Sequence, residues 1–345
     1  MKTFKKRLLP LVRMALGLGL LIYLGASGMI DWRALAGLGR AWPLSLAALG
    51  LVALAAIVLI AWRLCLLMRP HGLYVSFAAS IRLTLIGLFF NTCLPGSTGG
   101  DVVKIYYAME GNRGRRLEIA TIMMLDRVAG LLGILGFTLL LVPFFQPMLI
   151  AFPILKALVW AAGGSLVIVL AVLWGCTSNH AIWHRVVTWM VQTLPGGDYL
   201  ERVIHTLRIY RAYPGVCCQV IGASMAVHLC LTLSMLLTIQ ATHPVGADSE
   251  MILLIPIGFV ANSLPVTPGG LGVGEAAFDR LFQMAGFTGG AVAILGWRVL
   301  MMIVGLPGIL FYLLDKTQAV VPEQTPLRLA RQQQSAPVFK EHHEA

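Results

Sequence analysis

The stretch LIGLFFNTCLPGSTGGDVVKIYY (residues 85–107) is largely apolar and is broken near its middle by proline and paired glycines. A second stretch, NSLPVTPGGLGVGE (residues 262–275), carries the same P-x-x-x-G-G pattern 170 residues further along the chain. Backbone amides and carbonyls without hydrogen-bond partners cannot face lipid, so a broken helix at membrane depth must border other protein or a wet cavity. The two stretches therefore predict a cavity inside a membrane protein.

The rest of the chain has the composition of a polytopic membrane protein. Of its 345 residues, 58% are hydrophobic and only 12% are charged, whereas roughly a quarter of the residues of a soluble domain are charged. A bilayer core of about 30 Å requires about 20 apolar residues per helix. We therefore expect an all-α polytopic membrane fold with about six full transmembrane helices, the first of them retained. The six apolar runs lie at about residues 10–30, 43–67, 119–142, 153–175, 215–240 and 288–314.

Charge placement predicts which face of the membrane each segment meets, because Lys and Arg are enriched in cytoplasmic loops. Following the chain with this rule, the broken segment 76–103 begins and ends in the cytoplasm, and the broken segment 251–286 begins and ends outside. Each is therefore expected to be a re-entrant hairpin. We expect the protein to lie in the bacterial inner membrane with both termini in the cytoplasm. The basic segments are 2–7, 104–116, 185–211, 316–340 and Arg69, and the segments poor in positive charge are 31–40, 143–152 and 241–250.

The two hairpins fit an inverted-topology repeat, an architecture common among secondary transporters. Repeat A covers about residues 43–142 and repeat B about residues 215–314. A membrane arginine follows each broken segment, Arg127 in repeat A and Arg298 in repeat B, and the two are 171 residues apart. We expect the repeats to approach one another from opposite sides of the bilayer.

The domain organisation predicted from these features is simple. Residues 1–315 are expected to form a single integral membrane domain, in which the helix 153–175 and a cytoplasmic loop 176–214 connect the repeats. The polar tail 316–345 cannot bury enough apolar surface to fold alone. We expect it to be a disordered cytoplasmic end.

Polar side chains at membrane depth are the main candidates for function, because a charge there is costly and normally faces a partner, a cavity or water. Structural roles are the alternative. Asp126 and Arg127 lie near enough to the cytoplasmic end of their span to snorkel. Asp101 and Glu275 follow Gly-Gly breaks, where an acid complements the helix dipole. The residues expected to bind the substrate are Asn91, Asp101, Lys104, Asp126, Arg127, Asn262, Glu275 and Arg298.

Prolines and glycines in the broken segments are expected to shape the backbone, with close helix packing as the alternative role. A helix that begins after such a break directs free N–H groups and its positive dipole end into the cavity, which favours an anion such as a lipid phosphate. These backbone-shaping residues are Pro95, Gly99, Gly100, Pro265, Pro268, Gly269, Gly270 and Gly272.

Four further residues are candidates outside this set. Arg63 and Arg82 bracket the cytoplasmic entrance of the first hairpin, where basic residues are mostly topology anchors. His228 lies in the middle of the span 215–240, where a lone histidine more often bonds a neighbouring helix than relays protons. Asp279 is the remaining ionisable candidate at membrane depth.

Other functional classes are disfavoured. The chain contains no G-x-S-x-G, Walker, H-E-x-x-H or Cys/His metal pattern, so we predict no catalytic residues, no metal and no cofactor. The six cysteines include no C-x-x-C pair and predict no disulfide framework. The net charge of +11 lies in short clusters between apolar runs, which favours anionic lipid over nucleic acid as a partner.

The broken segments resemble the flippase-like membrane region of lysylphosphatidylglycerol synthases. The matching pieces are Asn91–Ala108 with its L-P-G-x-x-G-G-D core, Asp126-Arg127-x-x-Gly130 and Pro265–Glu275, and the resemblance covers about residues 10–315. The resemblance implies that in two-domain relatives this region moves an aminoacylated phospholipid across the bilayer, while a soluble domain performs the tRNA-dependent transfer. This chain resembles the stand-alone relatives without that soluble domain, some of which are associated with hopanoid or glycolipid pathways.

These observations predict a lipid translocator for an anionic phospholipid, a polyprenyl phosphate or a glycolipid or hopanoid-type lipid. Two alternatives stay open. One is a membrane-embedded lipid-modifying enzyme with Asp101, Asp126 or Glu275 as acid or base, and the other is an accessory subunit of a lipid or glycan biosynthesis complex. The expected partners are membrane lipids with an anionic head group, and lipid or glycan biosynthesis enzymes.

Overall fold

The computed structural model describes residues 32–93, 99–110, 112–178, 180–193, 196–242, 249–263, 273–284, 286–287 and 289–314, which contain helices and no strand. The predicted all-α fold is therefore confirmed. The predicted first helix (10–30) and polar tail (316–345) lie outside the described residues, as do Pro95, Pro265, Pro268, Gly269, Gly270 and Gly272.

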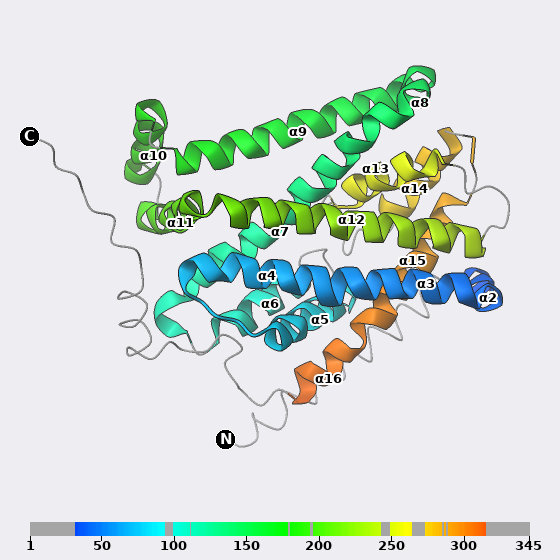
Figure 1. Cartoon of the computed structure of the whole chain (residues 1–345), viewed down its shortest axis with the longest axis horizontal. Coiled ribbons are helices and arrows are strands. Elements are labelled where there is room, and N and C mark those ends of the chain that lie inside the picture. The colour runs from blue at the N-terminus through cyan, green and yellow to red at the C-terminus, as the bar shows by residue number, and fades with distance from the viewer. Residues whose placement is uncertain are drawn as a thin grey trace, which may run out of the picture.

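The helices follow the apolar runs of the sequence closely (Figure 1). Short 3-10 turns occupy Arg69–His71, Arg113–Arg115, Val142–Phe145 and Tyr210–Ala212, and a π-helical segment occupies Leu54–Leu59. The α-helices are α2 (Trp32–Arg40), α3 (Trp42–Ala53), α4 (Ile60–Met68), α5 (Phe77–Cys93), α6 (Gly99–Met109), α7 (Arg116–Leu141), α8 (Gln146–Ala151), α9 (Pro153–Thr177), α10 (Ala181–Thr193), α11 (Gly197–Ile209), α12 (Pro214–Thr242), α13 (Met251–Ser263), α14 (Val273–Met284), α15 (Gly290–Gly305) and α16 (Pro307–Leu314).

Five helical stretches in the described part of the chain are long and apolar enough to cross a membrane. They correspond to the five predicted spans that the structure describes. The chain is thus a multi-pass membrane protein. The stretches are Trp42–His71, Arg116–Ala151, Pro153–Thr177, Pro214–Thr242 and Gly290–Leu314.

The centre of the molecule is a pair of long antiparallel helices, α12 and the continuous α3–α4 stretch, which lie side by side in Figure 1. Ser234 near the end of α12 donates a hydrogen bond of 3.0 Å to the carbonyl of Ala48 in α3. Tyr210, just before α12, donates one of 2.6 Å to the carbonyl of Leu67 in α4. Burial raises the pKa of the Tyr210 phenol, so the hydroxyl remains a donor.

The two broken segments form helical hairpins that pack on this central pair. In Figure 1, α5 and α6 lie nearer the end of the molecule occupied by α10 and α11, whereas α13 and α14 lie nearer the end occupied by α2 and α8. Helix α7 packs against α13, and α15 packs against α5. Each hairpin is therefore held by the long helix that follows the other hairpin.

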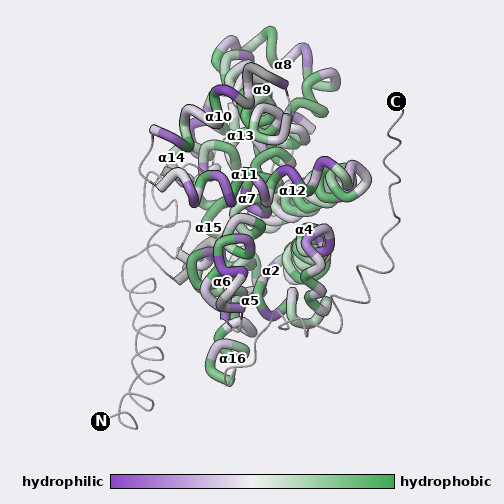
Figure 2. The backbone as a smooth tube through the Cα atoms, turned by 90° about the vertical axis from the view of Figure 1, so that its left-hand side faces the viewer, coloured by the Kyte–Doolittle hydropathy of each residue, from purple (hydrophilic) through white to green (hydrophobic). Residues whose placement is uncertain are grey.

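Apolar side chains cover much of the outer surface as well as the core. Helix α9 exposes Trp160, Val167 and Ile168 by 65–72% of their areas, and Figure 2, a view along the long axis, shows apolar residues along most helices. Such a surface is unfavourable in water and suits the hydrocarbon of a bilayer. The membrane assignment thus rests on the lipid-facing surface as well as on helix length.

Candidate functional site

A cavity of about 480 Å³ lies where the first hairpin meets the central helices. Its charged side chains come from α4, α6 and α7, whereas α12, α13 and α15 contribute no charged residue to the described lining. The polar residues that line it are Arg63, Thr84, Asn91, Asp101, Lys104, Asp126, Arg127, His228 and Asn262, and the apolar ones include Leu88, Leu131, Ile134, Val227, Leu231, Phe259 and Met301.

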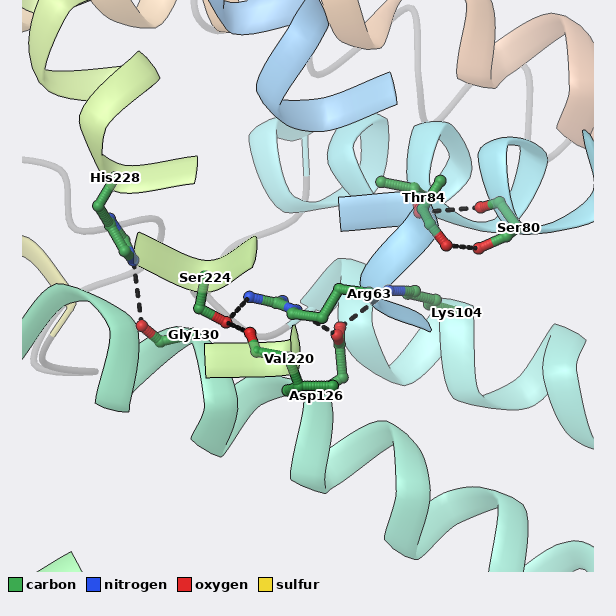
Figure 3. A network of polar contacts seen from close by, with 10 residues as sticks. Arg63, Ser80, Thr84, Lys104, Asp126, Gly130, Val220, Ser224 and His228 are labelled. Atoms are coloured by element: carbon green, nitrogen blue, oxygen red, sulfur yellow. Dashed lines mark hydrogen bonds and ion pairs between the residues drawn. The ribbon is translucent and has the colours of Figure 1, made fainter. Parts of the chain in front are cut away.

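Asp126 of α7 is the centre of a buried charged triad in this wall (Figure 3). Arg63 of α4 donates from Nε to Oδ1 of Asp126 at 2.7 Å, and Lys104 of α6 donates from Nζ to Oδ2 at 3.2 Å. Arg63 also donates from Nη1 to Ser224 Oγ of α12 at 3.0 Å. The three charged residues are each 5–6% exposed, so the triad joins four helices away from water.

Glycines allow the two helices of the first hairpin to approach closely enough to place Lys104. A Cβ atom on Gly87 of α5 would lie 3.4 Å from Cδ of Lys104, so the lysine stem lies directly across this glycine. A Cβ atom on Gly100 would lie 2.5 Å from the backbone nitrogen of Asn91. Gly100 instead donates its N–H to Oδ1 of Asn91 at 2.9 Å. A larger residue at position 100 would separate α6 from α5.

Asp101 and Arg127 form a second ion pair beside the triad. Both residues line the cavity, and the Arg127 side chain is 40% exposed. Because an ion pair with a partly exposed cation is easier to exchange than a buried one, this pair is the more accessible part of the polar wall.

The second hairpin carries a corresponding set of contacts. Arg298 of α15 donates from Nη2 to Oδ1 of Asn262 at 3.1 Å and pairs through Nη1 with Glu275 Oε1 at 3.3 Å. A Cβ atom on Gly274 would lie 2.6 Å from Nη2 of Arg298. Asn262 lines the cavity, so this cluster adjoins it from the side of the second hairpin.

The structure thus brings six of the eight predicted substrate-binding residues to the cavity wall. Of the other two, Arg298 bonds Asn262 and Glu275 pairs with Arg298. Gly99 begins α6, and Gly100 makes the close contact with Asn91. The glycine with the equivalent environment in the second hairpin is Gly274.

The sequence predicts Arg63 only as a weak candidate at the entrance, yet it belongs to the triad and bonds both Asp126 and Ser224. The signal was its position inside an apolar span, where an arginine requires a buried acid. Arg82 lies elsewhere, 5.9 Å over the ring of Phe311, and Asp279 accepts a hydrogen bond from Gln283. His228 contacts the Gly130 carbonyl through Nε2 at 3.0 Å, the helix-to-helix bond that the sequence favoured.

The described part of the cavity wall carries a net positive charge. Arg63, Lys104 and Arg127 contribute three cations, and Asp101 and Asp126 contribute two carboxylates. In the sequence, residues 94–98 and 264–272, which lie outside the described part of the chain, include no ionisable residue. The excess charge favours an anion inside the cavity.

The described residues contain no cluster of His, Cys, Asp and Glu with the arrangement of a metal site. No curated protein and no solved structure matches the chain. Residues 11–308, which include the cavity, both hairpins and all five spans except the end of the last, match the family described as the lysylphosphatidylglycerol synthase TM region. The chain belongs to this family.

Proposed function

We propose that this protein moves a lipid with an anionic head group across the bacterial inner membrane. The observation that carries the proposal is the net positive wall of a cavity that also has a large apolar side. An anionic head group can bind to the positive wall, and the glycerol backbone and upper acyl chains of the lipid can pack against the apolar side. The family is one of membrane lipid metabolism, which agrees with this substrate class.

The charged wall suits an anion that can exchange with a carboxylate. Asp126 fixes Arg63 and Lys104 on the cavity wall. Its one carboxylate balances only one of these two cations, so the triad keeps one positive charge. Arg127 shares its charge with Asp101 at the more accessible edge. A phosphodiester entering the cavity can take hydrogen bonds from these cations, and charge-assisted bonds of this kind are about twice as strong as neutral ones.

The similarity of the two hairpins supports an inverted repeat with two re-entrant segments. Asn91 and Asn262 are 171 residues apart, as are Arg127 and Arg298. In each hairpin an acid directly after a close-packed glycine pairs with the arginine of the following long helix. Inverted repeats permit alternating access, in which a site between them opens to one face and then to the other.

The proposal includes an orientation and a set of partners. Both chain termini are cytoplasmic, because the lysine- and arginine-rich loops lie on the side of the first hairpin. Residues 1–315 act as one membrane domain that takes its substrate from the lipid pool or from the enzymes that make it.

The proposal is tested with purified protein in vesicles that contain a fluorescent phospholipid, where an impermeant reductant reports the lipid that reaches the outer leaflet. We expect faster leaflet exchange for labelled phosphatidylglycerol than for labelled phosphatidylcholine. Lys104→Met removes one charge-assisted contact, and should slow exchange of the anionic lipid by roughly 10- to 100-fold.

Arg82→Met is the control, because it removes a positive charge from α5 outside the cavity. It should leave exchange unchanged. Normal exchange in folded Lys104→Met would refute the assigned role of the cavity. Absence of exchange with the unaltered protein, for every lipid tested, would refute translocation itself.

A further inference from the structure

The two hairpins use the same backbone design to hold different side chains. In the first, Gly87 lies four residues before Asn91 and faces Lys104, which lies four residues after Gly100. In the second, a Cβ atom on Gly258 would lie 2.7 Å from the ring of Phe278. Gly258 lies four residues before Asn262, and Phe278 lies four residues after Gly274. Phe278 therefore occupies in the second hairpin the place that Lys104 occupies in the first.

The neighbours of the two residues differ in the same way. Lys104 binds Asp126, the residue before the membrane arginine of α7. The residue before the membrane arginine of α15 is Trp297. Its ring lies 4.8 Å from that of Phe259, which in turn lies 5.5 Å from that of Phe278. A buried charged triad in one half thus corresponds to a buried aromatic cluster in the other.

The aromatic cluster meets the cavity through Phe259. Phe259 lines the cavity, while Phe278 and Trp297 lie behind it and are 0% and 7% exposed. Among the described residues, the first hairpin contributes lining residues from both of its helices, and α14 of the second contributes none. The described lining of the cavity therefore lies mainly on the side of the first hairpin, and Phe259 joins it to the other two rings.

We infer that Phe278, together with Phe259 and Trp297, is the closed gate between the cavity and the membrane face on the side of the second hairpin. This inference rests on the proposed function and on the inverted repeat. Packed rings leave no space for water and no partner for a charged head group. A head group leaves toward that face only when Phe278 moves away from Gly258, because that contact holds α14 against α13.

The asymmetry assigns a different task to each hairpin. The first holds the anionic head group through Lys104 and the triad, and the second seals the route with rings that interact with no charge. Phe278 is thus a gating residue whose removal should change access to the cavity. It should leave the charged contacts of the first hairpin in place, since none of them involves α14.

Access is measured by cysteine labelling in membranes, with the full chain and its six native cysteines replaced. Met301→Cys places a thiol on the cavity wall. Gly114→Cys and Ser249→Cys place exposed thiols on loops next to the first and second hairpin, so each marks one face. A membrane-impermeant methanethiosulfonate reagent is applied to right-side-out and inverted vesicles.

We expect the thiol at position 301 to react only from the face that labels position 114. Adding Phe278→Ala should make it react from the face that labels position 249 as well. Phe282→Ala is the matched control: Phe282 is 1% exposed, lies one turn further along α14 and has its ring centroid 6.1 Å from that of Phe278, but the nearest contacts of Gly258 are made by Phe278. It should leave labelling one-sided.

Three results would overturn the inference: labelling of position 301 from both faces in the parent, one-sided labelling in folded Phe278→Ala, or equal opening in Phe282→Ala. If Phe278→Ala fails to elute as a folded protein, Phe278→Leu keeps most of the packing and should open the second face partially; one-sided labelling there also overturns the gate. The assay needs no lipid, so a protein that moves no lipid yet shows this pattern would refute the proposed function and retain the gate.

Discussion

Asp126 is the residue whose replacement tests the charged triad most directly. Asp126→Asn keeps the size and shape of the side chain but removes the one carboxylate that both Arg63 and Lys104 contact. Two buried cations then face each other without a counter-charge. Removing one partner of a buried ionic cluster costs about 3–5 kcal/mol of folding free energy, because the remaining charge is desolvated and uncompensated.

Two companion variants test whether the loss of stability comes from the unpaired cations. Lys104→Met leaves Arg63 bonded to Asp126 and removes the excess charge, so it should cost only about 1–2 kcal/mol of stability. Adding Lys104→Met to Asp126→Asn removes one of the two opposed cations. The double variant should therefore be more stable than Asp126→Asn alone, with a coupling energy of about 1–3 kcal/mol.

The measurement is reversible unfolding in mixed micelles with an increasing fraction of denaturing detergent, followed by intrinsic tryptophan fluorescence. A loss below about 1 kcal/mol for Asp126→Asn, the value typical of solvated ion pairs, would show that water reaches the triad. Strict additivity in the double variant would show that Lys104 and Asp126 are independent. Lys104→Met also separates stability from function, since it should fold well yet fail in leaflet exchange.

Two further predictions concern positions outside the triad. Gly274→Ala brings a methyl group against Arg298 and Asn262, so it should displace the arginine and slow leaflet exchange, while Gly222→Ala, which faces open space on α12, should not. Tyr210→Phe removes the bond to the Leu67 carbonyl and should cost about 1 kcal/mol in the same unfolding assay. Burial raises the pKa of Tyr210. Its contribution to the free energy of unfolding is therefore fully present below the phenol's ordinary pKa of about 10 and declines as the pH rises through that value. A stability difference between Tyr210→Phe and the parent that stays constant up to pH 11 would contradict this.

The sequence predicted the spans well because apolar length is a local property. The runs 43–67, 119–142, 153–175, 215–240 and 288–314 each appear as a helix with nearly the same bounds. The breaks in the two hairpins were also predictable, since each combines proline with paired glycine, although either feature alone is tolerated inside a helix, as Pro256 in α13 and Gly163-Gly164 in α9 show. These features need no knowledge of tertiary contacts.

The partners of the charged residues were not predictable in the same way. Arg63 and Asp126 are 63 residues apart, and no periodicity or spacing links two side chains on different helices. Arg63 also lies close to a basic loop, where the average arginine is an anchor. Only the packing of α4 against α7 and α12 shows that this arginine is directed into the protein.

The sequence patterns and the structural contacts align the two hairpins differently. Matching the P-x-x-x-G-G patterns aligns Gly100 with Gly270, whereas the contacts of the asparagines align Gly100 with Gly274. The segment between asparagine and close-packed glycine is longer in the second hairpin. A pattern of proline and glycine identifies a break in a helix, but the residue at which the next helix resumes depends on what that helix packs against.

Divergence between the hairpins has a functional consequence if both halves descend from one ancestral unit. Two identical charged hairpins would place like charges on both sides of one cavity and would bind an anion equally well from either face. Phe278 at the lysine position and Trp297 at the acid position leave the second half without the charges of Lys104 and Asp126 and with close packing there instead. The backbone features that both halves retain, the asparagine, the close glycine and the acid–arginine pair, are those that hold a broken helix together at membrane depth. The positions at which the halves differ, 104, 126, 278 and 297, are those that decide whether the buried interior of each half is charged or aromatic.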